Sequence, residues 1–159
     1  MTPLLKHGIL ILSGASCWCN MANFRFFSGS GGGDNTKIVI NTSINENVND
    51  GDILRSKEAG AHGLLEKAND TGLNAVGVAM ASGSVGGTID VMYLGTYQVN
   101  FIEESLSSSD IGKRVFVSST NGQATITPPT ASGKTLIQLG YLRNTNGTCY
   151  INPQTLMIL

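Results

Sequence analysis

The chain has 159 residues, the size of one domain or of one domain with an arm. Its 10 lysines and arginines against 11 aspartates and glutamates argue against a nucleic-acid binder, because such proteins cluster positive charge against phosphates. Hydrophobic residues make up 41% of the chain, which excludes a disordered polypeptide driven by charge.

Turn-forming residues dominate the rest of the composition. Glycine, serine, threonine and asparagine number 20, 15, 14 and 14, together 63 of the 159 residues. Only 13% of residues are charged, so the charged helix formers are scarce. This composition, with short runs of valine, isoleucine and tyrosine, predicts an all-β fold. No run of about 18 apolar residues occurs, so we expect no spanning helix and no membrane partner.

The first twenty residues differ from the body of the chain, because they hold two of the three cysteines, the only tryptophan and one of the two histidines. Lys6, the apolar run at 8–12 and the small residues after it are the ingredients of a secretory leader. The interpretation that we favour is that translation starts at Met21 and that 1–20 is an over-extended start. Three cysteines, of which two are separated by one residue, predict neither a disulfide framework nor a zinc site.

Residues 21–50 are predicted to form an N-terminal arm with a glycine-rich tether and a first strand. Phe24, Arg25, Phe26 and Phe27 precede the glycines. An aromatic cluster before a flexible tether is typical of an arm that docks on another protein. These four residues are therefore the predicted partner-binding residues. The alternative is an edge strand joined to the domain by a loop.

Residues 51–159 are predicted to form a compact β-barrel or β-sandwich. With the strand that opens at Lys37, about nine short strands alternate with turns, the spacing of such folds. The runs that predict them lie at 37–41, 52–55, 64–68, 75–79, 88–100, 114–118, 123–127, 136–142, 149–151 and 156–159.

Several local signals refine this prediction. Asn121-Gly122 predicts the tip of a hairpin, since that dipeptide suits the turn between two paired strands. Gly77, within an apolar strand, indicates a close backbone approach or a bulge. A single helical turn is expected within 105–112, and 64–68 has a helical turn as its alternative.

Two motifs resemble known ligand-binding loops but depart from them at a required position. Gly133-Lys134-Thr135 resembles the end of a phosphate-binding loop, but Pro128 stands where that motif needs glycine. Residues 45–52 carry alternate oxygen side chains like a calcium loop, but Ser56 stands where the bidentate glutamate belongs. A solvated turn is the interpretation that we favour for that loop, with a structural Ca²⁺ as its alternative.

Acid–base residues are few. His7 lies in the leader, His62 lies beside a glycine turn, and the adjacent Glu103 and Glu104 would point to opposite faces of a strand. A site assembled from distant histidine, aspartate and serine residues stays an alternative. The sequence therefore predicts no enzyme, no catalytic residue, no cofactor and no metal.

The order of turn and strand motifs over 51–159 resembles small β-domains of tailed-bacteriophage virion structural proteins. These are capsid decoration (cement) proteins and related tail-fibre modules. The motifs are Gly51-Asp-Ile-Leu, Leu64-Leu-Glu-Lys-Ala-Asn69, Asn74-Ala-Val-Gly-Val-Ala79, Ile111-Gly-Lys-Arg-Val-Phe-Val-Ser118, Asn121-Gly122, Thr127-Pro-Pro-Thr130, Leu139-Gly-Tyr-Leu142 and Ile151-Asn-Pro153.

The resemblance implies a decoration protein that binds the major capsid protein lattice and stabilises the head, located on the capsid surface of the virion. It also implies a homo-oligomer, with a trimer favoured, and it carries over no catalytic residue. The alternative is a tail-fibre or adhesin-type module that contacts the host surface. A small secreted enzyme or cell-surface β-domain is a third class, expected only if the leader is real.

Overall fold

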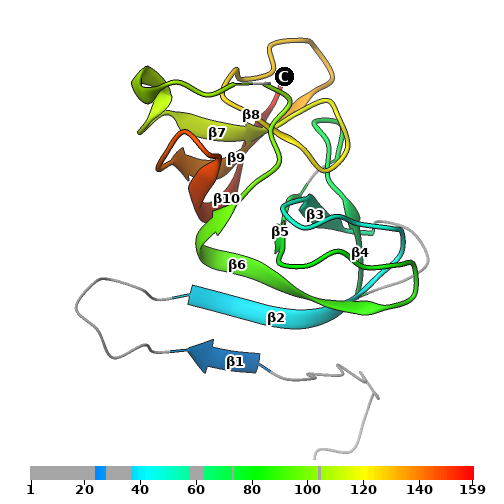
Figure 1. The fold of residues 1–159 in the computed structure, drawn as a ribbon. Coiled ribbons are helices and arrows are strands. Elements are labelled where there is room, and N and C mark those ends of the chain that lie inside the picture. The colour runs from blue at the N-terminus through cyan, green and yellow to red at the C-terminus, as the bar shows by residue number, and fades with distance from the viewer. Residues whose placement is uncertain (1–23, 28–36, 58–62, 73, 104) are drawn as a thin grey trace, which may run out of the picture.

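The computed structural model describes residues 24–27, 37–57, 63–72, 74–103 and 105–159, and for 24–27 it describes the backbone alone. Figure 1 shows that this part of the chain is built of strands and one short 3₁₀ turn, η1 (Ser108–Asp110), so the all-β prediction is confirmed. The strands are β1 (Phe24–Phe27), β2 (Lys37–Ile44), β3 (Ile53–Ser56), β4 (Leu64–Lys67), β5 (Gly77–Ala79), β6 (Thr88–Gln98), β7 (Arg114–Val117), β8 (Ala124–Thr125), β9 (Thr135–Leu142) and β10 (Thr148–Ile158).

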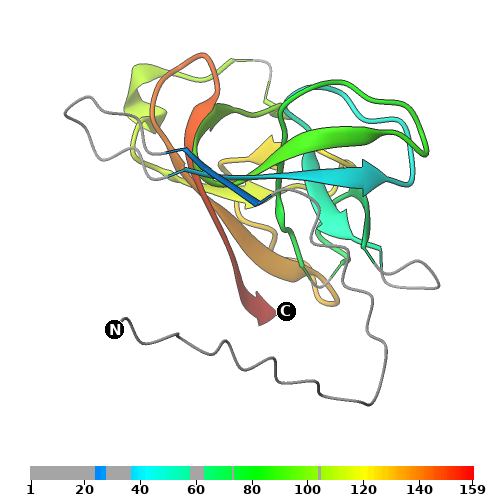
Figure 2. The same cartoon turned by 90° about the horizontal axis from the view of Figure 1, so that it is seen from below.

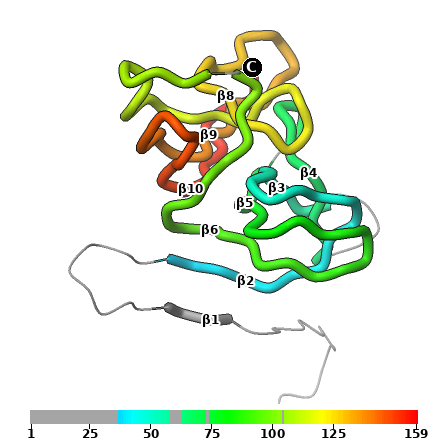
Figure 3. The backbone as a smooth tube through the Cα atoms, in the orientation of Figure 1, coloured from blue at the N-terminus to red at the C-terminus, as the bar shows by residue number. Residues whose placement is uncertain are grey.

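Five of the strands close into a small barrel. They pair in the order β2, β4, β3, β5 and β6, and β6 then pairs back onto β2. The β2–β4 pair is parallel and the others are antiparallel. From β6 the sheet continues through β10, β9, β7 and β8, which Figure 3 shows as the upper half of the molecule. Strand β6 is therefore the element shared by the barrel and the second sheet.

The long strand β6 serves two cores because its side chains alternate between faces. Ile89 and Val91 point into the barrel, while Met92 packs on the opposite side. The barrel core consists of Ile44, Val48, Leu54, Leu65, Ala79, Ile89 and Val91. Burial of each large apolar side chain stabilises the fold by about 1.5–3 kcal/mol, so both clusters contribute substantially.

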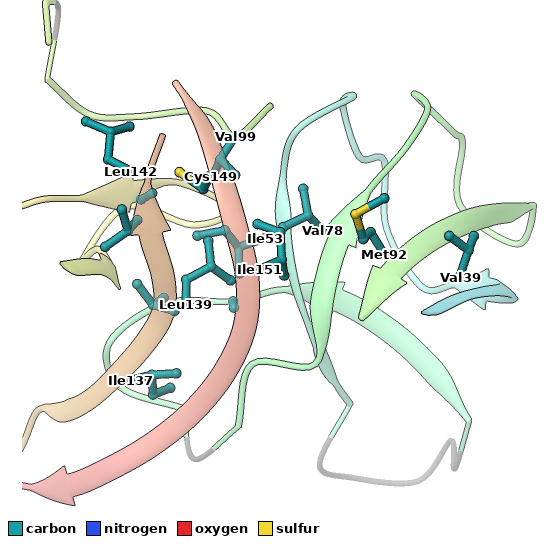
Figure 4. Packing of buried hydrophobic residues seen from close by; sticks show 14 residues of the cluster. Val39, Ile53, Val78, Met92, Val99, Ile137, Leu139, Leu142, Cys149 and Ile151 are labelled. Atoms are coloured by element: carbon teal, nitrogen blue, oxygen red, sulfur yellow. The ribbon is translucent and has the colours of Figure 1, made fainter. Parts of the chain in front are cut away.

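The larger core lies between the barrel wall and the second sheet. Figure 4 shows Ile53, Val78 and Met92 of the barrel strands beside Ile151 and other side chains of β9 and β10. The second sheet contributes mainly Val115, Val117, Ile137, Leu139, Leu142, Cys149 and Ile151. This shared core makes the barrel and the second sheet one packed unit.

Local predictions from glycine are confirmed. Gly122 has a φ of 79° in the turn between β7 and β8, which explains the Asn-Gly signal there. A Cβ on Gly77 would collide with the Met92 carbonyl oxygen and approach Val91 Cγ1 to 2.9 Å, which is the predicted close approach. The expected helical turn is η1.

Two expectations about strands were wrong. Residues 149–151 and 156–159 are not separate strands, because β10 runs continuously from Thr148 to Ile158. Its pairing with β9 shifts register between Ile151 and Gln154, so Pro153, which has no N–H to donate, falls in the irregular step. The helical alternative for 64–68 is also wrong, since Leu64–Lys67 is strand β4.

Candidate interaction surface

The ionisable side chains of the described residues are largely occupied by one another. Ion pairs join Lys113 Nζ to Asp110 Oδ1 at 2.7 Å and Lys134 Nζ to Asp70 Oδ1 at 2.9 Å. The others are Arg55–Glu66 at 2.9 Å and Lys67–Asp52 at 3.4 Å. Within the described part of the chain, no group of three or more histidine, cysteine, aspartate or glutamate residues is arranged to hold a metal ion.

The Asn/Asp-rich loop at 45–52 directs its oxygen atoms at separate protein donors. Asn47 Oδ1 accepts from Val85 N at 3.0 Å, and Asp50 Oδ1 accepts from the Tyr97 hydroxyl at 2.8 Å. Asp52 Oδ2 accepts from Asn49 N at 2.9 Å. These contacts hold the loop against the barrel and give each of these oxygens a donor from the protein. The arrangement therefore favours the turn that we preferred over the calcium alternative.

The remaining candidate residues for chemistry either have other contacts or lie outside the described residues. Lys134 is paired with Asp70, and Thr135 begins a strand where a phosphate-binding loop would begin a helix. His7, His62 and Glu104 lie outside the described residues. Among the described residues, no helix is long and apolar enough to cross a membrane.

The pKa values of Tyr97, Cys149 and Asp110 are shifted away from neutral pH, and burial also raises the pKa of Tyr93. Burial, and then the hydrogen bond to Asp50, raise the pKa of Tyr97 to about 12. Burial raises the pKa of the Cys149 thiol to about 12. The hydrogen bond from Lys113, followed by those from Ser107, holds the pKa of Asp110 well below its usual range. These shifts therefore make none of these groups a better acid or base near neutrality.

The predicted partner-binding residues form strand β1 at the edge of the sheet. β1 pairs antiparallel with the first half of β2, from Phe24 opposite Ile40 to Phe27 opposite Lys37. Figure 2 shows β1 crossing β2 on the outside of the barrel. The backbone thus adopts the edge-strand alternative, and contact of Phe24, Arg25, Phe26 and Phe27 with a partner stays a prediction.

The most exposed apolar side chains of the second sheet lie at the end of β10. Leu156, Met157 and Ile158 are 43%, 53% and 65% exposed, and we call these three residues the C-terminal apolar edge. β6 stops pairing with β10 at Ile151, so among the described strands only β9 pairs with Gln154–Ile158. No residue from 144 to 159 has a charged side chain. The edge therefore presents uncharged, apolar side chains to solvent.

A second irregularity in β10 affects how this edge can be used. The pairing with β9 steps from Thr155 directly to Met157, so Leu156 is an extra, bulged residue. Bulges at sheet edges twist the strand and disfavour regular addition of another strand. The C-terminal apolar edge is therefore suited to packing through side chains. The sequence predicted a strand here but not its exposure, because a short apolar run is equally typical of a buried strand.

Two hollows lie near the junction of the sheets. One, of about 360 Å³, is lined by Ile102, the two prolines 128–129 and the Asp70–Lys134 pair. The backbone of Lys134 accepts a hydrogen bond from Leu159 N at 2.8 Å, which places this hollow close to the end of β10. The other, of about 420 Å³, is lined by residues 99–101, 103, 105–106 and 145–147 and has mostly polar walls.

Comparison of the chain with protein-family models, with curated proteins and with solved structures finds no match. The motifs over 51–159 and the C-terminal apolar edge are therefore the features of the chain that bear on its function.

Proposed function

We propose that this chain is a bacteriophage capsid decoration protein that binds the lattice of the major capsid protein and stabilises the head. It acts by binding and does not catalyse a reaction, and its copies assemble as a trimer. Two kinds of support underlie the proposal. The motifs over 51–159 resemble those of phage virion proteins, and the C-terminal apolar edge offers a surface for docking.

The C-terminal apolar edge is the observation that carries the docking step. Leu156, Met157 and Ile158 are consecutive and all exposed, whereas exposed apolar residues on a protein surface are usually single and scattered. Burial of about half of each side chain against another protein would contribute on the order of 1 kcal/mol per residue. Such a contact is weak for one copy, but a trimer on a repeating lattice engages several sites at once and gains avidity.

The arm supplies a second proposed contact. One edge of β1 is occupied by β2, and no other strand among the described residues pairs with it. A strand or loop of the shell protein can add to that edge through main-chain hydrogen bonds, with Phe24, Phe26 and Phe27 as apolar anchors.

Imaging and mass spectrometry of the native particle test the location. A decoration protein is expected on the head in a copy number comparable to that of the shell protein. Scarce density confined to the tail would instead support a fibre module and would overturn the proposal. Absence from purified virions would overturn both.

A matched pair of variants tests the surface. Ile158 and Val85 are 65% and 64% exposed, so Ile158→Glu and Val85→Glu introduce the same charge at equal exposure. We expect both variants to fold and only Ile158→Glu to lose occupancy on expanded heads that lack the protein. Equal occupancy of the two variants would exclude the C-terminal apolar edge.

Deletion of residues 21–33 tests the arm in the same assay. We expect reduced occupancy, since both the aromatic cluster and its tether are removed. Occupancy equal to that of the full chain would end the role proposed for Phe24–Phe27.

A further inference from the structure

Glu103 is one of the residues that line the polar hollow of about 420 Å³, and its carboxylate has an unusual set of contacts. Glu103 Oε1 accepts hydrogen bonds from the Thr125 hydroxyl at 2.5 Å and from Ile126 N at 3.1 Å. Its other oxygen, Oε2, is covered by protein and has no hydrogen-bond partner. It is the only such buried side-chain oxygen or nitrogen that the described residues contain. Buried polar atoms are normally paired, so this oxygen calls for an explanation.

Four of the five other partly or fully buried carboxylates among the described residues have a cationic partner; the fifth, Glu46, accepts a hydrogen bond from Lys67 N. Asp52, Asp70 and Asp110 each have a lysine partner, and Glu66 has Arg55. Glu103 has no cation within the part of the chain that the structure describes. Removal of a charge from water is costly unless an opposite charge compensates it.

The walls of the hollow also suit a cationic side chain. Asn100, Ser105 and Asn146 bring polar groups to it, while Phe101 and Leu106 bring apolar surface. An arginine or lysine side chain needs this combination, because its stem packs on apolar groups while its cationic head pairs with an acid. The volume is ample for one such side chain.

We propose that this hollow is a receptor for a basic side chain, arginine or lysine, of the partner protein, with Glu103 Oε2 as its acceptor. The inference rests on the proposed function for the identity of the partner, the major capsid protein. The proposed chemistry does not depend on which protein is the partner. A cationic group binds a carboxylate that has no counter-ion among the described residues. Entry requires a small rearrangement, because Oε2 is covered in the free chain.

The variant Glu103→Gln separates this role from a structural one. Glutamine keeps an oxygen for Thr125 and Ile126 but removes the charge, so we expect the melting temperature of the free protein to stay or rise. Binding to heads should weaken by about 30-fold or more, the usual consequence of loss of one member of a buried charge pair. A fall in melting temperature with unchanged binding would show a structural role and overturn the proposal.

Asp90→Asn is the matched control, because it makes the same change in net charge at an exposed residue of β6. We expect it to bind heads like the parent chain. A loss equal to that of Glu103→Gln would mean that net charge governs binding, and this would also overturn the proposal.

A titration of the free chain, in the absence of capsid heads, tests the receptor separately from the decoration role. The full chain is titrated with argininamide, and the amide signal of Ile126 is followed by NMR. We expect a saturable shift that is absent in Glu103→Gln and absent with the neutral citrullinamide. Failure of heads to bind the parent chain, with this shift present, would reject the decoration role but keep the receptor. Absence of the shift in the parent chain would reject the receptor.

Discussion

The side-chain amide of Asn100 donates a 3.0 Å hydrogen bond to Asp52 Oδ1 and so ties the segment after β6 to the turn before β3. The same amide nitrogen donates to the backbone oxygen of Asp50 at 2.8 Å. Asp52 is 4% exposed, and its second oxygen accepts from Asn49 N and lies 3.4 Å from Lys67 Nζ. One carboxylate therefore joins three segments at the junction of the barrel and the second sheet.

Asp52→Ala should lower the free energy of unfolding by about 3 kcal/mol, because it leaves buried donors without an acceptor. Urea unfolding measures this loss. Asn41→Ala is the control, since Asn41 makes an exposed hydrogen bond to Asp90, and we expect its effect to stay within about 0.5 kcal/mol. Equal losses of unfolding free energy in the two variants would show that the buried hydrogen-bond network stabilises the fold no more than one exposed hydrogen bond does.

Gly77→Ala should be strongly destabilising, by about 3 kcal/mol or more, because the new methyl group meets the backbone of Met92, which cannot move without breaking the sheet. Gly86→Ala is the comparison. Gly86 has a φ of 81° and open space around its Cβ position, so only backbone strain of about 1 kcal/mol is expected. Thermal unfolding of both variants measures which one is less stable. A larger loss of stability for Gly86→Ala than for Gly77→Ala would contradict the close approach at Gly77.

The stability of the protein should fall in acid partly through Asp110. Hydrogen bonds from Lys113 and Ser107 lower the pKa of Asp110 in the folded chain below its ordinary value of 3.8. A lowered folded pKa contributes stability above pH 3.8 that is lost as the pH falls below that value. The melting temperature of Asp110→Asn should therefore lie below that of the parent chain at neutral pH, and the gap should shrink in acid. A constant gap would show that Asp110 does not contribute through its charge.

Cys149 should resist thiol reagents until the chain unfolds. Its side chain is 0% exposed, and burial raises the pKa of its thiol to about 12, so thiolate is scarce and hidden. In the variant Cys17→Ser/Cys19→Ser, labelling with iodoacetamide should be negligible in buffer and complete in urea. Rapid labelling of the folded protein would show that the larger core opens readily.

Much of the fold was predictable because its signals are local. The Asn121-Gly122 turn, the strand over 88–100 and the close approach at Gly77 all follow from short-range geometry. The continuity of β10 was not predictable, since Pro153 normally ends a strand and is tolerated here only by a shift in register.

The candidate surface was harder to predict, because exposure depends on which strands become neighbours. Leu156, Met157 and Ile158 form an apolar run, and only the tertiary structure shows that no element covers it among the described residues. The contacts of Glu103 likewise join it to Thr125 and Ile126, more than twenty positions away. Only the tertiary structure shows that one of its oxygens is left without a donor.

The position of β10 in the sheet has a consequence for biosynthesis. Strand β10 follows the other described strands in the chain, lies between β6 and β9, and carries Cys149 and Ile151 into the larger core. The second sheet cannot join the barrel until β10 has been synthesised, so a nascent chain without β10 carries uncovered apolar surface. A chain truncated before Cys149 should therefore leave the larger core uncovered. We expect such a chain to aggregate and to bind chaperones.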